Sequence, residues 1–153
     1  MIVSSYRIEK SIVIDTDPAS IWEMLTVPEL MKQWMGDPEM DLKIQTDWTV
    51  NSSIIISGFH HIRFENKGTI LQYSPHEILS YSHLSSVSRL TDNPDNYSIL
   101  EFVLLPITGK TKLSVTVSNF PTEVIFRHLN FYWTTTIHRL KIWLSKPILK
   151  IAN

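Results

Sequence analysis

Histidine and tyrosine side chains within predicted strands could supply polar or acid–base chemistry. Tyr81 and His83 lie two residues apart in the predicted strand Ile78–Leu84, so they share one face of it. If that face points inward, His83 could bind a polar group; if outward, it is an ordinary surface histidine. His60 and His61 are adjacent, and a strand would point them to opposite faces. We therefore expect no shared metal ion and no metal site.

No set of catalytic residues is visible in the chain. It has no Gly-x-Ser-x-Gly elbow, no phosphate loop and no dinucleotide fingerprint. Only 4 glycines are present, too few for a loop that cradles a cofactor, and cysteine is absent, which removes thiolate chemistry. We expect no catalytic residue and no cofactor, although an aspartate–histidine pair could still assemble in space.

Hydroxyl groups cluster in the middle of a predicted helix. Thr134, Thr135 and Thr136 are β-branched, and each is less than about 1 kcal/mol worse than alanine in a helix. One explanation is that the helix leaves room where it crosses a cavity, so that Thr136 and Tyr132 offer hydroxyls to a ligand. The other is that the fold tolerates a poor local propensity.

The chain holds 5 tryptophans, which is many for its length. Core packing is one explanation, because buried aromatic side chains dominate core energetics. The other is that Trp34 and Trp133 line the mouth of a cavity and stack on a flat ligand.

One long amphipathic helix, Pro121–Leu144, is expected to position these groups. At 1.5 Å per residue it would be about 36 Å long, so it needs a large apolar partner surface. Its predicted inner face carries Ile125, Leu129, Tyr132, Trp133, Thr136, Leu140 and Trp143. Val124, Phe131 and Ile142 form a second apolar line off that face, which could support a homodimer or another protein partner.

Strands and two short helices are expected before the long helix. A strand over Ser4–Asp15 leads to helices starting at Asp17-Pro18 and at Pro28, since Asp caps helices and Pro suits the first turn. Alternation then predicts Met40–Gln45, Ser53–Gly58, Ile62–Glu65 with Thr69–Tyr73, Ile78–Leu84, Ser98–Leu105 and Lys112–Asn119. Asn66-Lys67-Gly68 is a turn signal that would interrupt the third of these segments.

This order predicts an α+β fold in a single domain, residues 1–153. A curved antiparallel sheet of about six or seven strands would wrap around the long helix, with the two short helices after the first strand. A cavity between sheet and helix is then expected.

Charge and hydropathy exclude several kinds of partner. The net charge of −1 gives no basic field for nucleic acid or an anionic membrane. No apolar run is long enough to cross a bilayer, and Met1 to Lys10 has no signal-peptide pattern. We expect a cytoplasmic protein that binds neither nucleic acid nor membrane.

Short motifs spread over nearly the whole chain match one family in order and spacing. They are Ile14 to Trp22 (IDTDPASIW), Val27 to Trp34 (VPELMKQW), Thr46 to Ser53 (TDWTVNSS), Lys67 to Leu79 (KGTILQYSPHEIL), Asp92 to Tyr97 (DNPDNY), Gly109 to Leu113 (GKTKL) and the helical trio Trp133, Ile137 and Leu140. Together they resemble the helix-grip fold of the START-like (SRPBCC) superfamily, and within it the homologues of the activator of the heat-shock-protein ATPase. Asn51 and Tyr132 stand where the family usually has glycine, and Asp95 where it usually has glutamate.

The resemblance implies a fold with a pocket and no single chemistry, because the superfamily contains ligand carriers, a few enzymes and chaperone-binding domains. Our leading hypothesis is non-enzymatic binding of a small, largely hydrophobic molecule between sheet and helix. The expected ligand-binding residues are Trp34, His83, Phe102, Leu104, Leu113, Val115, Leu129, Tyr132, Trp133, Thr136 and Leu140. The alternatives are a protein-interaction or chaperone co-factor domain, and an enzyme acting on an aromatic or polyketide-like substrate.

Overall fold

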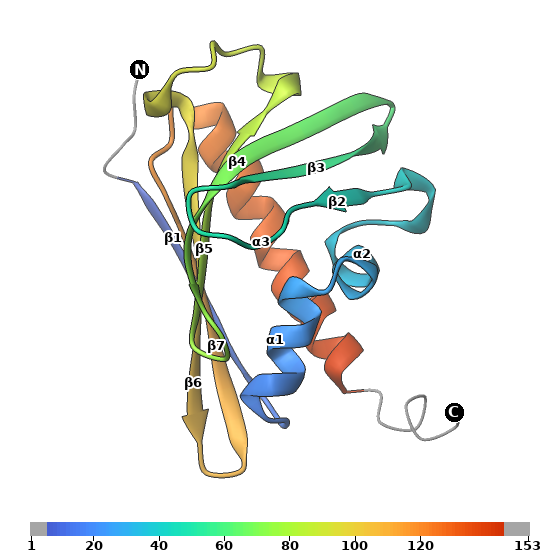
Figure 1. Cartoon of the computed structure of the whole chain (residues 1–153), viewed down its shortest axis with the longest axis vertical. Helices are drawn as coiled ribbons and strands as arrows, with labels where there is room; N and C mark the ends of the chain where they lie inside the picture. The colour runs from blue at the N-terminus through green and yellow to red at the C-terminus, as the bar shows by residue number, and fades with distance from the viewer. Residues whose placement is uncertain (1–5, 146–153) are drawn as a thin grey trace.

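The computed structural model describes residues 6–145 and contains one sheet and three α-helices (Figure 1). In chain order the elements are β1 (Arg7–Ile14), α1 (Pro18–Thr26), α2 (Pro28–Met35), the 3-10 turn η1 (Pro38–Met40), β2 (Lys43–Gln45), β3 (Ser53–His60), β4 (Ile62–Ser74), β5 (Ile78–Ser85), the 3-10 turns η2 (Ser86–Ser88) and η3 (Pro94–Asn96), β6 (Ser98–Ile107), β7 (Lys110–Ser118) and α3 (Glu123–Leu144). The α+β class and the element order agree with the prediction.

The seven strands form one antiparallel sheet in the order β1-β7-β6-β5-β4-β3-β2. The sheet bends around α3, and the two short helices lie beside that helix (Figure 1). Apolar side chains on the concave face of the sheet form a continuous buried core with α1, α2 and α3. This is the helix-grip arrangement expected from the sequence.

Helix α3 begins at Glu123, two residues later than predicted. The Thr122 hydroxyl accepts a hydrogen bond from the Ile125 backbone N–H at 3.2 Å, which caps the first turn. Thr134 and Thr135 turn their hydroxyls back to carbonyls of the preceding turn, at 2.7 Å from Asn130 O and 3.1 Å from Tyr132 O. The helix therefore remains continuous through the threonine run.

Helices α1 and α2 follow each other directly. Asp17 accepts a hydrogen bond from the Ser20 backbone N–H at 2.8 Å, and Pro18 occupies the first helical position, as predicted. The indole N–H of Trp34 donates to the Met24 carbonyl at 2.7 Å, which ties the end of α2 to α1.

The predicted turn at Asn66-Lys67-Gly68 is wrong. These residues lie inside the continuous strand β4 and pair with β3, where Asn66 faces Ile56 and Gly68 faces Ile54. The turn between β3 and β4 falls at His61, within the break predicted between Ser53–Gly58 and Ile62–Glu65, and His61 adopts a left-handed backbone, φ 66°. The two imidazoles therefore do not point to opposite faces of a strand; their centroids are 4.6 Å apart.

Strand boundaries also differ from the prediction, most of all in the first two strands. The first strand covers Arg7–Ile14 rather than Ser4–Asp15, and the first two predicted residues lie outside the described part of the chain. Met40 belongs to η1, so the next strand is only Lys43–Gln45. Proline at the start of η1 favours the turn over an extended strand there.

Candidate functional site

An aromatic cluster fills the middle of the space between the sheet and α3. It consists of Trp34 from α2, Phe102 from β6 and Trp133 from α3, whose ring centroids lie 5.7–6.5 Å apart. Their exposed fractions are 1%, 1% and 4%. The rings pack on one another at tilted and edge-to-face angles, an arrangement that favours aromatic contact.

Two tyrosines lie next to this cluster. Tyr81 of β5 has its ring centroid 6.3 Å from that of Phe102, and Tyr132 of α3 donates a hydrogen bond to the Met35 carbonyl at 2.8 Å. Burial raises the pKa of Tyr132 to about 12, while a hydrogen bond with Thr136 acts in the opposite direction. Burial also raises the pKa of Tyr81. Both phenols therefore stay neutral and act as hydrogen-bonding groups, not as bases.

His83 continues the same face of β5 and points into the concave side of the sheet. Its cross-strand partner Ser98 and its neighbour Tyr81 are both buried there. Burial, with a smaller contribution from His128 of α3, lowers the pKa of His83 to about 4. At neutral pH His83 is therefore an uncharged imidazole, able to donate one hydrogen bond and accept another.

A polar residue that the sequence analysis placed in a turn, Asn66, also faces the concave side. It lies directly opposite buried Ile56 of β3 and opposite Ser85 of β5. Its Oδ1 atom is buried and has no hydrogen-bond partner. An orphan acceptor of this kind costs about 1–3 kcal/mol. No sequence signal marked this position, because Asn66 lies between Glu65 and Lys67 and opens an Asn-Lys-Gly turn pattern.

Asn66, His83 and Ser98 together form what we call the polar end of the concave face. Asn66 and His83 are diagonal neighbours across β4 and β5, because Asn66 pairs with Ser85, two residues beyond His83. Such neighbours lie roughly 7–8 Å apart on one face of a sheet. Gly68 lets the backbones of β4 and β5 come close at this point, because a Cβ atom there would lie 1.7 Å from the Ser82 carbonyl oxygen.

The remaining predicted site residues extend the apolar surface on the other side of the aromatic cluster. Leu104 pairs with Leu113 and Phe102 with Val115 across β6 and β7. These side chains, like Leu140 and Thr136 of α3, are buried, while Leu129 is half-buried against the core. The predicted residues thus belong to one interface between sheet and helix.

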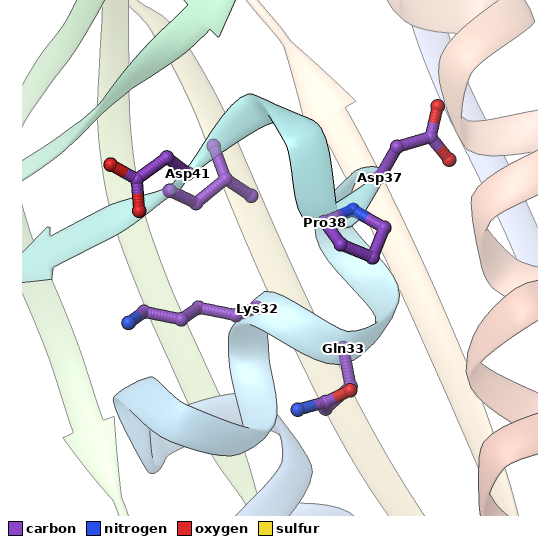
Figure 2. A pocket seen from close by; sticks show the side chains of 6 residues that line it. Lys32, Gln33, Asp37, Pro38 and Asp41 are labelled. Atoms are coloured by element: carbon purple, nitrogen blue, oxygen red, sulfur yellow. The ribbon is translucent and has the colours of Figure 1, made fainter.

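Two pockets open elsewhere on the described surface. A pocket of about 200 Å³ has Lys32 and Gln33 of α2 on one side and Asp37, Pro38 and Asp41 on the other (Figure 2). It is smaller than typical small-molecule sites, which measure about 300–1,000 Å³.

A more open pocket of about 650 Å³ lies between the start of α1, the β4–β5 turn and the end of β6. Its polar lining includes Asp17, His76 and Glu77, and its apolar lining includes Leu104 and Leu105. Leu104 is therefore the one predicted site residue that also lines either of these two pockets.

Within residues 6–145, no three histidine or carboxylate side chains are grouped so that they could hold a metal ion. None of the helices in that part of the chain combines the length and the apolar character needed to cross a bilayer.

The fold and its buried interface agree with a known family. The family model for Activator of Hsp90 ATPase homolog 1-like protein matches residues 15–145. The chain belongs to this family. Membership supports a ligand-binding or cofactor-like domain. No match was found among the curated proteins.

Solved structures of similar chains share the fold over almost the full length. The solution structure of ChR145 from Cytophaga hutchinsonii has a TM-score of 0.77 and 29% identity, covering 94% of this chain and 96% of that one. The crystal structure of CV1439 from Chromobacterium violaceum has a TM-score of 0.78 and 15% identity, covering 91% and 96%. The Aha1 dimer from Colwellia psychrerythraea, solved in solution, has a TM-score of 0.71 and 21% identity, covering 92% and 96%.

Proposed function

We propose that this protein binds a small, largely hydrophobic molecule between its sheet and α3, without catalysing a reaction. One observation carries the proposal: His83, a polar side chain, points into the interface and is kept neutral there by burial. Burying a polar side chain in a core costs free energy, so an interface that served only stability would be more stable with an apolar residue at position 83. A ligand with an apolar body and one polar group would use this side chain.

The ligand body lies, in this proposal, between β3–β5 and the first half of α3. Leu129 and Tyr132 of α3 would contact it, and Trp34, Phe102 and Trp133 would form its floor. Thr136 lies one turn beyond Tyr132 in α3 and is buried, so its side chain would border the same space. Apolar contact would supply most of the affinity, at about 25 cal/mol for each Å² of ligand area removed from water.

Leu104, Leu113, Val115 and Leu140 support the aromatic floor in this proposal. Along β6, Leu104 lies two residues beyond Phe102, on the side away from Ser98 and His83. Leu113 and Val115 pair with these two residues on β7. Their expected effect on binding is therefore indirect, through the position of the Phe102 ring.

A ligand screen with a blocking variant tests the proposal. Native mass spectrometry of protein purified from its own host should reveal a bound small molecule. A thermal-shift panel of lipids, aromatic compounds and polyketides should contain stabilising ligands. Leu129→Trp would fill the site and abolish the response, while Thr134→Trp, on the exposed face of α3, would retain it. No retained molecule and no shift with any compound would contradict the proposal.

A second candidate function is interaction with another copy of the chain through the outer face of α3. Val124, Phe131 and Ile142 are 76%, 73% and 59% exposed, which is unusual for large apolar side chains. The dimeric Aha1 structure from Colwellia psychrerythraea supports a second copy as the partner.

Sedimentation equilibrium tests the self-association directly. We expect a concentration-dependent dimer that Phe131→Asp weakens at least tenfold, because a buried unpaired charge is costly at an interface. Thr134→Asp, which adds the same charge to a neighbouring exposed position, should dimerise like the native chain. A native chain that stays monomeric at millimolar concentration would rule out this function.

A further inference from the structure

Asn66 is the polar residue on the concave face whose hydrogen-bonding capacity is left unused. Its Oδ1 is the single buried side-chain nitrogen or oxygen atom within residues 6–145 that lacks a hydrogen-bond partner. Buried polar atoms are almost always paired, so each exception calls for a physical explanation. A carboxamide oxygen can only accept a hydrogen bond. The missing partner must therefore be a donor.

The surroundings of Asn66 restrict what that donor can be. On the same face lie Ile56 of β3 and Ser85 of β5. The Ser85 hydroxyl accepts a hydrogen bond from the Val87 N–H at 3.2 Å and forms none with Asn66 Oδ1. Across the diagonal lies His83, an uncharged imidazole at neutral pH. Lys67, the adjacent residue of β4, points to the opposite face of the strand and forms an ion pair with Asp92.

Of the described residues opposite or diagonal to Asn66, namely Ile56, Ser85 and His83, none carries a permanent positive charge. His128 of α3 is the titratable group that acts electrostatically on His83. An anionic ligand group beside Asn66 would meet an acceptor oxygen and a neutral ring. These contacts would not offset the free-energy cost of removing the anion from water. A neutral hydroxyl group fits better, because it can donate to Asn66 Oδ1 and accept from an N–H of His83.

We propose that Asn66 determines ligand specificity, and that the ligand is a neutral, largely apolar alcohol or phenol whose hydroxyl donates to Asn66 Oδ1. This inference rests on the proposed ligand-binding function and adds the chemical class of the ligand. Carboxylic acids such as free fatty acids and compounds with acceptor groups only, such as ethers and ketones, are bound less well.

A matched ligand series tests the donor requirement. The probes are 2-naphthol, its methyl ether and 2-naphthoate, which present a donor, an acceptor and an anion on the same ring system. Binding is measured by quenching of tryptophan fluorescence or by calorimetry at pH 7.5. We expect 2-naphthol to bind about tenfold more tightly than its methyl ether, because only 2-naphthol can donate a buried hydrogen bond to Asn66.

The variant Asn66→Leu completes the test. Leucine has a similar volume but no acceptor, so the variant should bind 2-naphthol and its methyl ether with equal affinity. The same variant should raise the melting temperature of the free protein, because an orphan buried acceptor is removed. Gln72→Leu makes the same amide-to-leucine change at an exposed position of β4 and should keep the tenfold preference.

The outcomes distinguish a failure of the specificity assigned to Asn66 from a failure of the proposed ligand-binding function. If all three probes and the wider panel fail to bind, the proposed function fails. If they bind but 2-naphthol and its ether have equal affinity, or 2-naphthoate is preferred, the specificity assigned to Asn66 is wrong. A tenfold preference that survives in Asn66→Leu is also incompatible with it.

Discussion

Acid is expected to destabilise this protein through His83. In the unfolded chain a histidine has a pKa of about 6.5, whereas burial lowers the pKa of His83 to about 4 in the folded protein. Between these values the unfolded state binds more protons than the folded state. The free energy of unfolding is therefore fully retained above pH 6.5 and falls as the pH drops toward 4.

The size of the effect follows from the width of that interval. Each pH unit costs 2.303RT, so lowering the pH from 6.5 to 5 should remove about 2 kcal/mol of stability. Because His83 retains some exposure to solvent, this figure is an upper value. Against a typical stability of about 5–15 kcal/mol, such a loss is readily measured.

Urea unfolding at pH 7.5 and pH 5.0, followed by tryptophan fluorescence, provides the assay. The native chain should lose up to about 2 kcal/mol more between the two pH values than His83→Gln, which cannot protonate. His60→Gln changes an exposed histidine in the β3–β4 turn and should keep the native pH dependence. The reasoning is refuted if His83→Gln loses as much stability as the native chain, or if NMR finds His83 titrating near pH 6.5.

Three further substitutions test contacts beneath α3. Tyr132→Phe should cost about 1–2 kcal/mol in urea unfolding, because the Met35 carbonyl loses its donor. Trp34→Ala should cost about 3–5 kcal/mol, since it opens a cavity and leaves the Met24 carbonyl unpaired; a smaller loss would mean that the interface is loosely packed. Thr122→Ala should cost about 1 kcal/mol through the lost cap of α3, whereas Thr122→Ser should retain the native melting temperature.

The helices were predicted closely because their signals are local. Helix α3 was predicted from apolar spacing and begins within two residues of the expected position. Asp17-Pro18 marked the start of α1 correctly, since capping depends only on neighbouring residues. The exposed line of Val124, Phe131 and Ile142 also followed from helical periodicity.

The strands were predicted less well where two signals conflicted. Asn66-Lys67-Gly68 has the composition of a turn, yet pairing with strands on both sides holds these residues extended in β4. The one turn in this region is at His61, between the predicted segments Ser53–Gly58 and Ile62–Glu65. Strand pairing depends on residues far apart in the chain, and a local pattern does not contain it.

The sequence by itself determined the helices, the order of the elements and the family resemblance, because periodicity, capping and short motifs can be read from the chain directly. Only the tertiary structure decided what lies under α3. It packed Trp34, Phe102 and Trp133 into one cluster, turned His83 inward and left Asn66 Oδ1 without a partner. Burial and hydrogen bonding at these positions depend on strands and helices that are distant in sequence, so the charge state of His83 and the unmet acceptor appear only once the chain has folded.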